Sequence, residues 1–299
     1  MCCRNPNHRE LTGSQDRIRL MTHRWRKDAG VRIEGSTPLD NSKVQAPCIV
    51  RNPSGGYRIF YTAVGLGKPF PDCQGYILSA VSEDGLVFQK EPGIRLSPQP
   101  ATNHISLRVL APTVTRCLEG GWRMYFEARG SASHPTVICS AISCDMLKWN
   151  IEQGIRLRSP GGLSGPRYLE LSDGRGRLYC CKSELEQDTS VRSKTLISAV
   201  TSNGLDFEFD HQVHDLRSEQ VDYDTAGLTA AEPVSPQSEG DRWTMIYSAW
   251  QDVPVGTVVP IHPSSDTDLS KSGTSIDFAR ASIAVDMAGY RSRIFESHS

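Results

Sequence analysis

Short apolar stretches separated by polar, glycine-rich turns recur along the chain. The stretch at 46–63, APCIVRNPSGGYRIFYTA, reads as a strand, a turn and a second strand, and 111–128, APTVTRCLEGGWRMYFEA, repeats it. Apolar and polar residues alternate with the period of two that strands require, and Asn, Pro, Ser and Gly are typical of tight turns. The sequence therefore predicts β-hairpins that recur at intervals.

A proline anchors each repeat, and an apolar, aromatic-rich strand begins ten residues after it. The prolines and the first residues of these strands are Pro47 and Tyr57, Pro112 and Trp122, Pro166 and Gly176, and Pro233 and Trp243. Third strands rich in small and β-branched residues are predicted at 77–88, 138–149, 196–207 and 280–290. Short closing segments follow at 93–98, 154–160 and, more weakly, 213–218. An isolated copy of the closing segment lies at 30–33.

Four strands in each repeat, with one closing strand displaced to the N-terminus, predict an all-β fold of the β-propeller type. The whole chain, 1–299, is expected to form a single propeller domain. We predict five blades, the fifth assembled from both ends of the chain. Four blades is the alternative, in which the N-terminal strand completes the last repeat. Residues 1–15 are expected to be a flexible tail and 251–275 a long inserted loop.

Composition narrows the class of partner. The formal net charge is −1, which provides no overall field for nucleic acid or an anionic membrane. The chain contains no apolar run long enough for a transmembrane helix. Its nine cysteines lack the spacing of a metal site and are interpreted as reduced thiols of a cytoplasmic protein. We expect a small-molecule substrate and no cofactor or metal; the sequence does not indicate the oligomeric state.

The residue before the anchor proline is small in three repeats and acidic in the fourth. Ala46, Ala111 and Gly165 hold this position in the first three repeats, and Glu232 holds it in the last. The innermost strands of a propeller line its central channel, where a carboxylate is costly unless it is used or paired. Two interpretations stay open. Glu232 is a general acid, a general base or a ligand anchor at the channel mouth, or it is a structural acid paired with an arginine such as Arg167.

A second departure from the repeat lies fifteen residues after the proline. Thr62, Cys181 and Ser248 occupy this position in three repeats, and Glu127 occupies it in the other. Desolvation of a half-buried glutamate raises its pKa, as a proton donor at neutral pH requires. The structural alternative is an ion pair with one of three arginines at a shared position: Arg58, Arg123 and Arg177.

Other candidate ligand-binding residues flank the predicted inner strands. Asp224 and Tyr223 precede Glu232 in DYDTAGLTAAEP (222–233) and are expected near the same rim. His104 lies before the second inner strand. Trp250 is either a sugar-stacking platform or a core residue.

Two residues beside the first inner strand complete the set. Gln45 offers hydrogen bonds to a polar ligand, and Arg51 suits an anion. Recurring turn residues are interpreted instead as turn-formers: Asp84, Asp145, Asn203 and Asp286.

The inner-strand proline, the strands YRIFY (57–61) and WRMYF (122–126) and the turn SAVSEDG (79–85) resemble those of the five-bladed propeller glycosidase superfamily. This superfamily includes arabinanase- and xylosidase-like, invertase-like and levansucrase-like enzymes and related mannoside phosphorylases. The resemblance covers nearly the whole chain. It implies three catalytic carboxylates on inner strands, one of them an acid followed closely by proline.

Glu232, in AAEPVS, is similar to the acid of that superfamily. The other two expected carboxylates are missing, because Gln45-Ala46-Pro47 and Ser164-Gly165-Pro166 stand where acidic residues would be expected. Asp224 or Glu127 is then the candidate partner of Glu232.

Three functional hypotheses follow. The first is acid/base catalysis on a small glycosidic or polyhydroxylated substrate. The second is a scaffold redirected to non-hydrolytic chemistry in a biosynthetic pathway, of which phosphorolysis with Arg51, Arg167 and His104 around the phosphate is a special case. The third is a non-catalytic carbohydrate or ligand binder.

Overall fold

The structure is a computed structural model that describes residues 32–66, 72–117, 120–185, 192–210, 227–234, 243–253, 281–284 and 291–295. From 227 onward it describes the backbone and its pairing. Every regular element in these ranges is a β-strand, which confirms the predicted all-β class for this part of the chain. The blade number depends on the closing segment predicted at 30–33, in which Arg32 and Ile33 form no strand. Residues 1–31, which include the rest of this segment and the tail predicted at 1–15, lie outside the described residues.

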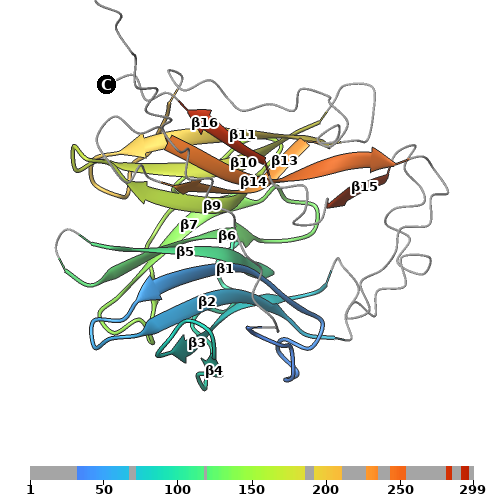
Figure 1. Cartoon of the computed structure of the whole chain (residues 1–299). Helices are drawn as coiled ribbons and strands as arrows, with labels where there is room; N and C mark the ends of the chain where they lie inside the picture. Colours follow the sequence, from blue (N-terminus) through green and yellow to red (C-terminus); the bar gives the residue numbers. More distant parts are fainter. Residues whose placement is uncertain are drawn as a thin grey trace, which may run out of the picture. The chain divides into compact units, whose positions relative to one another are not determined.

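In the described ranges, sixteen strands fall into four sequence repeats (Figure 1). Repeat 1 comprises β1 (Lys43–Arg51), β2 (Tyr57–Val64), β3 (Gly75–Ser82) and β4 (Gln89–Lys90). Repeat 2 comprises β5 (Arg108–Arg116), β6 (Trp122–Arg129), β7 (Val137–Ser143) and β8 (Asn150–Ile151). Repeat 3 comprises β9 (Leu163–Glu170), β10 (Gly176–Leu185), β11 (Arg192–Thr201) and β12 (Glu208–Phe209). Repeat 4 comprises β13 (Gly227–Val234), β14 (Trp243–Val253), β15 (Ala281–Ala284) and β16 (Arg291–Phe295).

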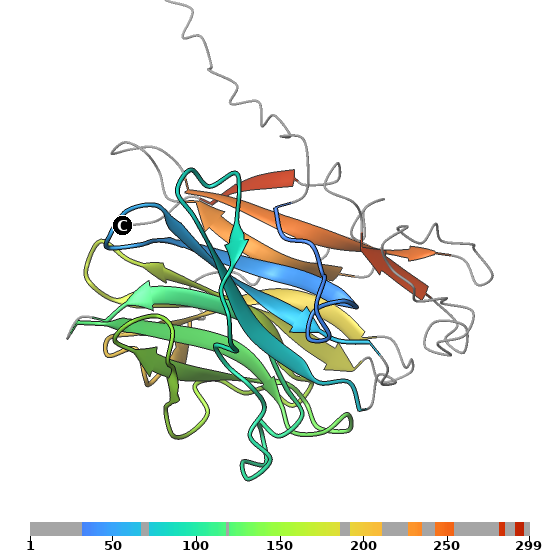
Figure 2. The ribbon, with the colours of Figure 1, turned by 90° about the horizontal axis from the view of Figure 1, so that it is seen from below.

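Within each of the first three repeats the strands pair antiparallel in chain order, as the hairpin pattern predicts. One parallel bridge, Gly75 to Arg108, joins repeats 1 and 2 into an eight-stranded sheet, and repeat 3 forms a four-stranded sheet. Figure 2 shows these sheets after a 90° turn. The inner strands of successive repeats contact one another, β1 with β5, β5 with β9 and β9 with β13.

Repeat 4 differs from the prediction in its third strand. β15 and β16 both pair with β14, β15 along Trp250–Val253 and β16 along Trp243–Tyr247. The predicted third strand at 280–290 therefore supplies only one of the two strands that pair with β14 on this side, and 291–295 supplies the other. β14 also continues through Val253, so 251–253 are strand, whereas the rest of the predicted loop, 254–275, lies outside the described residues.

The predicted closing segments are mostly not strands. Two-residue strands, β4, β8 and β12, occupy the fourth position, and each closing segment of repeats 1 and 2 adds a single bridge. These bridges join Ile77 to Leu96 and Ile138 to Leu157. The strand is interrupted because Gly93 and Gly154 adopt positive φ angles of 84° and 92°.

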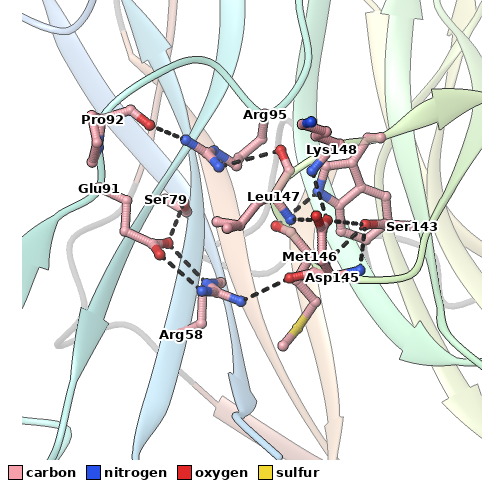
Figure 3. Close-up of polar contacts among 11 residues, drawn as sticks. Arg58, Ser79, Glu91, Pro92, Arg95, Ser143, Asp145, Met146, Leu147 and Lys148 are labelled. Carbon is pink, nitrogen blue, oxygen red and sulfur yellow. Dashed lines mark hydrogen bonds and ion pairs between the residues drawn. The ribbon is translucent and has the colours of Figure 1, made fainter.

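Arginines of one repeat hold the turn of the next repeat through main-chain oxygens (Figure 3). Arg58 forms two hydrogen bonds of 2.8 Å with Glu91 and a third of 3.5 Å with the Asp145 carbonyl. Arg95 donates to the Leu147 carbonyl at 3.2 Å. The same contacts recur one repeat later, from Arg123 to Glu152 and the Asn203 carbonyl and from Arg156 to the Leu205 carbonyl.

Two apolar clusters fill the spaces between repeats. One combines Phe60 and Ile77 of repeat 1 with Met124 and Phe126 of repeat 2. The other combines residues of repeats 2 and 3: Tyr125, Ile138, Leu163, Leu178, Cys180 and Ile197. Trp122 is buried, and Trp149 packs edge-on against Phe60, so both serve in packing as their repeat positions predict.

The recurring turn residues act as predicted. Asp84 accepts hydrogen bonds from the Leu86 and Val87 amides, and these bonds lower the pKa of its carboxyl group. Asp145 and Asn203 accept the equivalent pairs. Asp286 lies outside the described residues.

Candidate active site

Each inner strand carries a β-bulge at the anchor position. The register of β1 and β2 shifts between Gln45 and Cys48, so that two residues, Ala46 and Pro47, face one residue on β2. The same shift occurs between Leu110 and Thr113 on β5. The residue before the bulge proline has a positive φ angle of 52° in Ala46, 48° in Ala111 and 57° in Gly165.

This backbone conformation explains the small residues at the anchor position. A Cβ atom added at Gly165 would meet nothing within 4 Å, so crowding in a channel, the predicted reason, does not account for the glycine. A left-handed residue is tolerated best when its side chain is short or absent. The Ala-Pro pairs of repeats 1 and 2 and the Gly-Pro pair of repeat 3 are therefore bulge-forming sequences.

Side chains of one repeat accept hydrogen bonds from the bulge of the next repeat. Thr62 Oγ1 accepts from the Ala111 amide at 2.7 Å, and Glu127 Oε2 accepts from the Gly165 amide at 3.3 Å. Thr62 and Glu127 occupy equivalent positions, paired across the sheet with Gln45 and Leu110. Glu127 therefore makes the contact that a threonine makes in repeat 1.

The structural alternative for Glu127 was an ion pair with Arg58, Arg123 or Arg177. In the structure each of these arginines forms an ion pair with a different acidic residue. Arg58 pairs with Glu91, Arg123 with Glu152, and Arg177 with Asp210 at 2.6 Å. These three ion pairs occur at the same place in three repeats. The sequence pattern identified the arginines correctly as a set but did not identify their acidic partners.

A second set of equivalent residues directly follows the bulge proline. Cys48 Sγ accepts from the Val114 amide at 3.3 Å, and Thr113 Oγ1 accepts from the Tyr168 amide at 3.2 Å. In repeat 3 this position is Arg167, which is 9% exposed. Its guanidinium donates to the carbonyl oxygens of Pro47, Pro112 and Pro166, at 3.3, 3.4 and 2.9 Å. Arg167 thus connects the bulges of three inner strands.

The register places Glu232 in this second set. β13 pairs Thr229 with Ser248 and Glu232 with Ile246, so the bulge residues of repeat 4 are Ala230 and Ala231. The anchor alignment, which equated Glu232 with Ala46 and Ala111, is therefore wrong by two positions, because Pro233 lies two residues beyond the bulge. Glu232 is equivalent instead to Cys48, Thr113 and Arg167. Its strand, β13, contacts the strand that carries Arg167.

The remaining candidates from the described region lie apart from this set. Gln45 is exposed on β1 opposite Thr62. Arg51 lies over the Tyr57 ring, with 5.1 Å between its guanidinium carbon and the ring centre, as Arg116 lies over Trp122 at 4.0 Å. His104 lines a cavity of about 530 Å³ beside Trp149, and burial and the nearby Arg158 lower its pKa.

Three candidates belong to the less described part of the chain. Asp224 and Tyr223 lie outside the described residues. For Trp250 the structure describes the backbone, which pairs with Gly227 and Ala284.

Several solved structures of similar fold are named as glycoside hydrolases. A thermostable family-43 glycoside hydrolase matches with a TM-score of 0.53 and 13% identity, over 69% of this chain and 64% of that chain. A family-117 glycoside hydrolase from Zobellia galactanivorans matches with a TM-score of 0.51 and 15% identity, over 73% and 70%. A family-32 β-fructofuranosidase from Bombyx mori matches with a TM-score of 0.52 and 16% identity, over 86% and 51%. The chain has the fold of the propeller glycosidases.

At these identities the likeness concerns the fold. The chain spans a little under two thirds of the first two matched structures, 64% and 63%. No model of a known protein family matches the sequence. No curated protein sequence matches it either.

The set that directly follows the bulge was not predicted as a functional position. Its signal in the sequence is the residue after the anchor proline, which changes from Cys48 to Thr113 to Arg167 along the first three repeats. Among the described residues, no group of three or more His, Cys, Asp or Glu side chains is arranged to hold a metal ion. A search of the same residues found no helix long and apolar enough to cross a membrane.

Proposed function

We propose that this protein is a glycosidase-like enzyme that uses Glu232 for acid/base catalysis on a small polar or glycosidic substrate. The observation that carries the proposal is the register of β13. It assigns Glu232 to the same inner-strand position as the buried Arg167 of the preceding repeat. The fold shared with glycoside hydrolases supports this reading of an acidic residue on an inner strand.

The partner carboxylate is better sought in Asp224 than in Glu127. Hydrolysis of a glycosidic bond ordinarily requires two carboxyl groups on either side of the bond. Glu127 accepts the Gly165 amide just as Thr62 accepts the Ala111 amide, which supports a structural role for Glu127. Asp224 precedes Glu232 by eight residues in the same segment.

The chemistry we propose is proton transfer to or from a substrate oxygen by Glu232. Arg167 would bind a polar or anionic substrate group nearby, since guanidinium groups suit carboxylates and phosphates. The absence of acidic residues from Gln45-Ala46-Pro47 and Ser164-Gly165-Pro166 favours chemistry other than standard hydrolysis, such as phosphorolysis or a biosynthetic transfer.

The test compares Glu232→Gln with Glu127→Thr. The wild-type protein and both variants are assayed on aryl glycosides of arabinose, xylose, mannose and fructose, with and without inorganic phosphate. We expect Glu232→Gln to lower kcat by about 100-fold or more, as for loss of a general acid or base. Glu127→Thr installs the residue that repeat 1 uses and should keep kcat within about threefold.

Full activity of folded Glu232→Gln would remove Glu232 from the mechanism. A large loss in Glu127→Thr, with unfolding unchanged, would assign the second carboxylate to Glu127 in place of Asp224.

A non-catalytic ligand-binding propeller is the second candidate. Two inner strands lack the expected carboxylates, which favours a protein without catalysis. The Arg167 guanidinium donates to three main-chain carbonyls, which favours a structural role for this residue. Calorimetric binding of a saccharide without turnover, unchanged in Glu232→Gln, would support the binder over the enzyme.

A further inference from the structure

A cavity lies between repeats 2 and 3, away from the bulges. It has a volume of about 590 Å³, within the usual range for sites that bind small molecules. Its walls come from the end of the β5–β6 hairpin, the start of the turn after β7, parts of β8 and β9, the β9–β10 hairpin and the turn after β11. Among the described residues, neither Glu127 nor Arg167 is part of these walls. This cavity is therefore separate from the candidate active site.

Two residues of repeat 3 differ together from their equivalents in the other repeats, and they give the cavity an aromatic wall. The second strands of the other repeats begin with Tyr57, Trp122 and Trp243, whereas β10 begins with Gly176. A Cβ atom at Gly176 would lie 2.0 Å from the hydroxyl oxygen of Tyr168. The tyrosine therefore requires the glycine.

Tyr168 occupies the position of Val114 in repeat 2. Its ring is half-buried and stacks on Tyr125, with 5.1 Å between ring centres and 20° between planes. Both tyrosines contribute to the cavity wall.

The charged groups of the wall are largely engaged within the protein. Arg123 and Glu152 form two hydrogen bonds of 2.9 and 3.0 Å, and Arg116 covers the Trp122 ring. A ligand with a strong charge would have to compete with these contacts, at a cost in desolvation.

Neutral hydrogen-bonding groups are available at the rim. Ser202 and Asn150 are exposed, and Thr115 is half-buried. Burial and the neighbouring Glu170 raise the pKa of the Tyr168 hydroxyl, which stays protonated and able to donate at neutral pH. Aromatic surface combined with hydroxyl and amide groups suits a ligand that has both C–H faces and hydroxyl groups.

We propose that this cavity is a second binding site for a neutral polyhydroxylated small molecule, such as a mono- or disaccharide. The site does not depend on the proposed catalytic role of Glu232.

The test uses glucose, maltose and sucrose as probes, with glucuronate as the charged comparison, on the full chain. Calorimetry gives the affinities, and alkylation by iodoacetamide followed by mass spectrometry reports on Cys144, an exposed thiol in the cavity wall. We expect at least one neutral sugar to bind, to bind more tightly than glucuronate and to slow alkylation of Cys144. Glu232→Gln should show the same protection, because the site is separate.

A blocking variant and a matched control locate the binding. Ser202→Trp places a large side chain at the rim, whereas Glu83→Trp introduces the same side chain at the equivalent exposed turn position of repeat 1, outside the cavity. We expect Ser202→Trp to weaken the affinity by about tenfold or more, equivalent to about 1.4 kcal/mol, and Glu83→Trp to leave it unchanged.

Several results would overturn the proposal. They are the lack of binding by all three neutral sugars, tighter binding of glucuronate, unchanged affinity in folded Ser202→Trp, and loss of Cys144 protection in Glu232→Gln. The last result would assign the sugar to the candidate active site and leave the proposed function intact.

Discussion

At the scale of single residues, the left-handed position before the bulge proline is the feature that recurs most closely. Ala46 and Ala111 adopt positive φ despite their Cβ atoms, and Gly165 does so without one. Nothing lies within 4 Å of a Cβ built on Gly165, so a substitution there changes backbone energy alone.

We therefore expect Gly165→Ala to lower the free energy of unfolding by about 1 kcal/mol, because alanine disfavours the left-handed region. Ala111→Gly should shift it by a similar amount in the opposite sense. Urea unfolding of the two variants measures both changes. A destabilisation of Gly165→Ala several times larger would mean that side-chain clashes, and not backbone conformation, limit this position.

At the scale of elements, Gly176 on β10 leaves the space that the Tyr168 side chain of β9 fills. Substitutions at the two positions test how the paired strands pack. A methyl group at 176 meets the hydroxyl oxygen at 2.0 Å and the ring carbon that carries it at 2.4 Å. We expect Gly176→Ala to cost about 2 kcal/mol of stability through overpacking.

Combining it with Tyr168→Val, the residue type that repeat 2 has at Val114, should remove most of that cost. Combining it with Tyr168→Phe should not, because the ring carbon remains in place. Chemical unfolding of the single and double variants gives the coupling energy, expected at about 1–2 kcal/mol for contacting residues. Additive costs would show that the two positions do not share this space.

The strands and turns of the first three repeats could be predicted from the sequence, and the site register could not. Alternation, aromatic strand starts and glycine turns are local signals, so the hairpins around Tyr57 and Trp122 follow from them. The position of Glu232 depends on where a bulge inserts two residues against one, and Pro233 gave a misleading anchor because it lies beyond the bulge.

The ion pairs of Arg58, Arg123 and Arg177 were missed for a related reason. Their acidic partners lie 29 to 33 residues further along the chain, at a position fixed only once the third and fourth strands are paired. No local pattern encodes that distance.

At the scale of the whole molecule, a buried carboxylate, Asp40, and a partly buried one, Glu91, make stability depend on pH. Burial by itself would raise the pKa of Glu91, but hydrogen bonds from Arg58 and Ser79 outweigh it and lower the pKa below the usual 4.5. Burial acts likewise on Asp40, and hydrogen bonds from Lys90, Thr37 and Ser36 lower its pKa.

A carboxyl group whose pKa is lower in the folded state stabilises the protein above its unfolded-state pKa and loses that effect as the pH falls through the folded-state value. We expect the free energy of unfolding to be steady from about pH 7 to pH 5 and to fall below about pH 4.5.

Glu91→Gln should be less stable at neutral pH and should lose less stability on acidification. Denaturant unfolding at several pH values measures the slope, and Asp173→Asn, at an exposed ion pair, serves as the control. An identical pH slope for Glu91→Gln and the wild type would exclude Glu91 as a source of the dependence.

The arginine contacts between repeats reach carbonyl oxygens of the next turn, and every residue type supplies a carbonyl. Leu147 can therefore change identity while Arg95 keeps its carbonyl as partner, and the contact between neighbouring repeats is preserved. The side chains of such a turn can be replaced, in evolution or by design, to create a new binding surface. The main-chain contacts that hold the repeats together are kept.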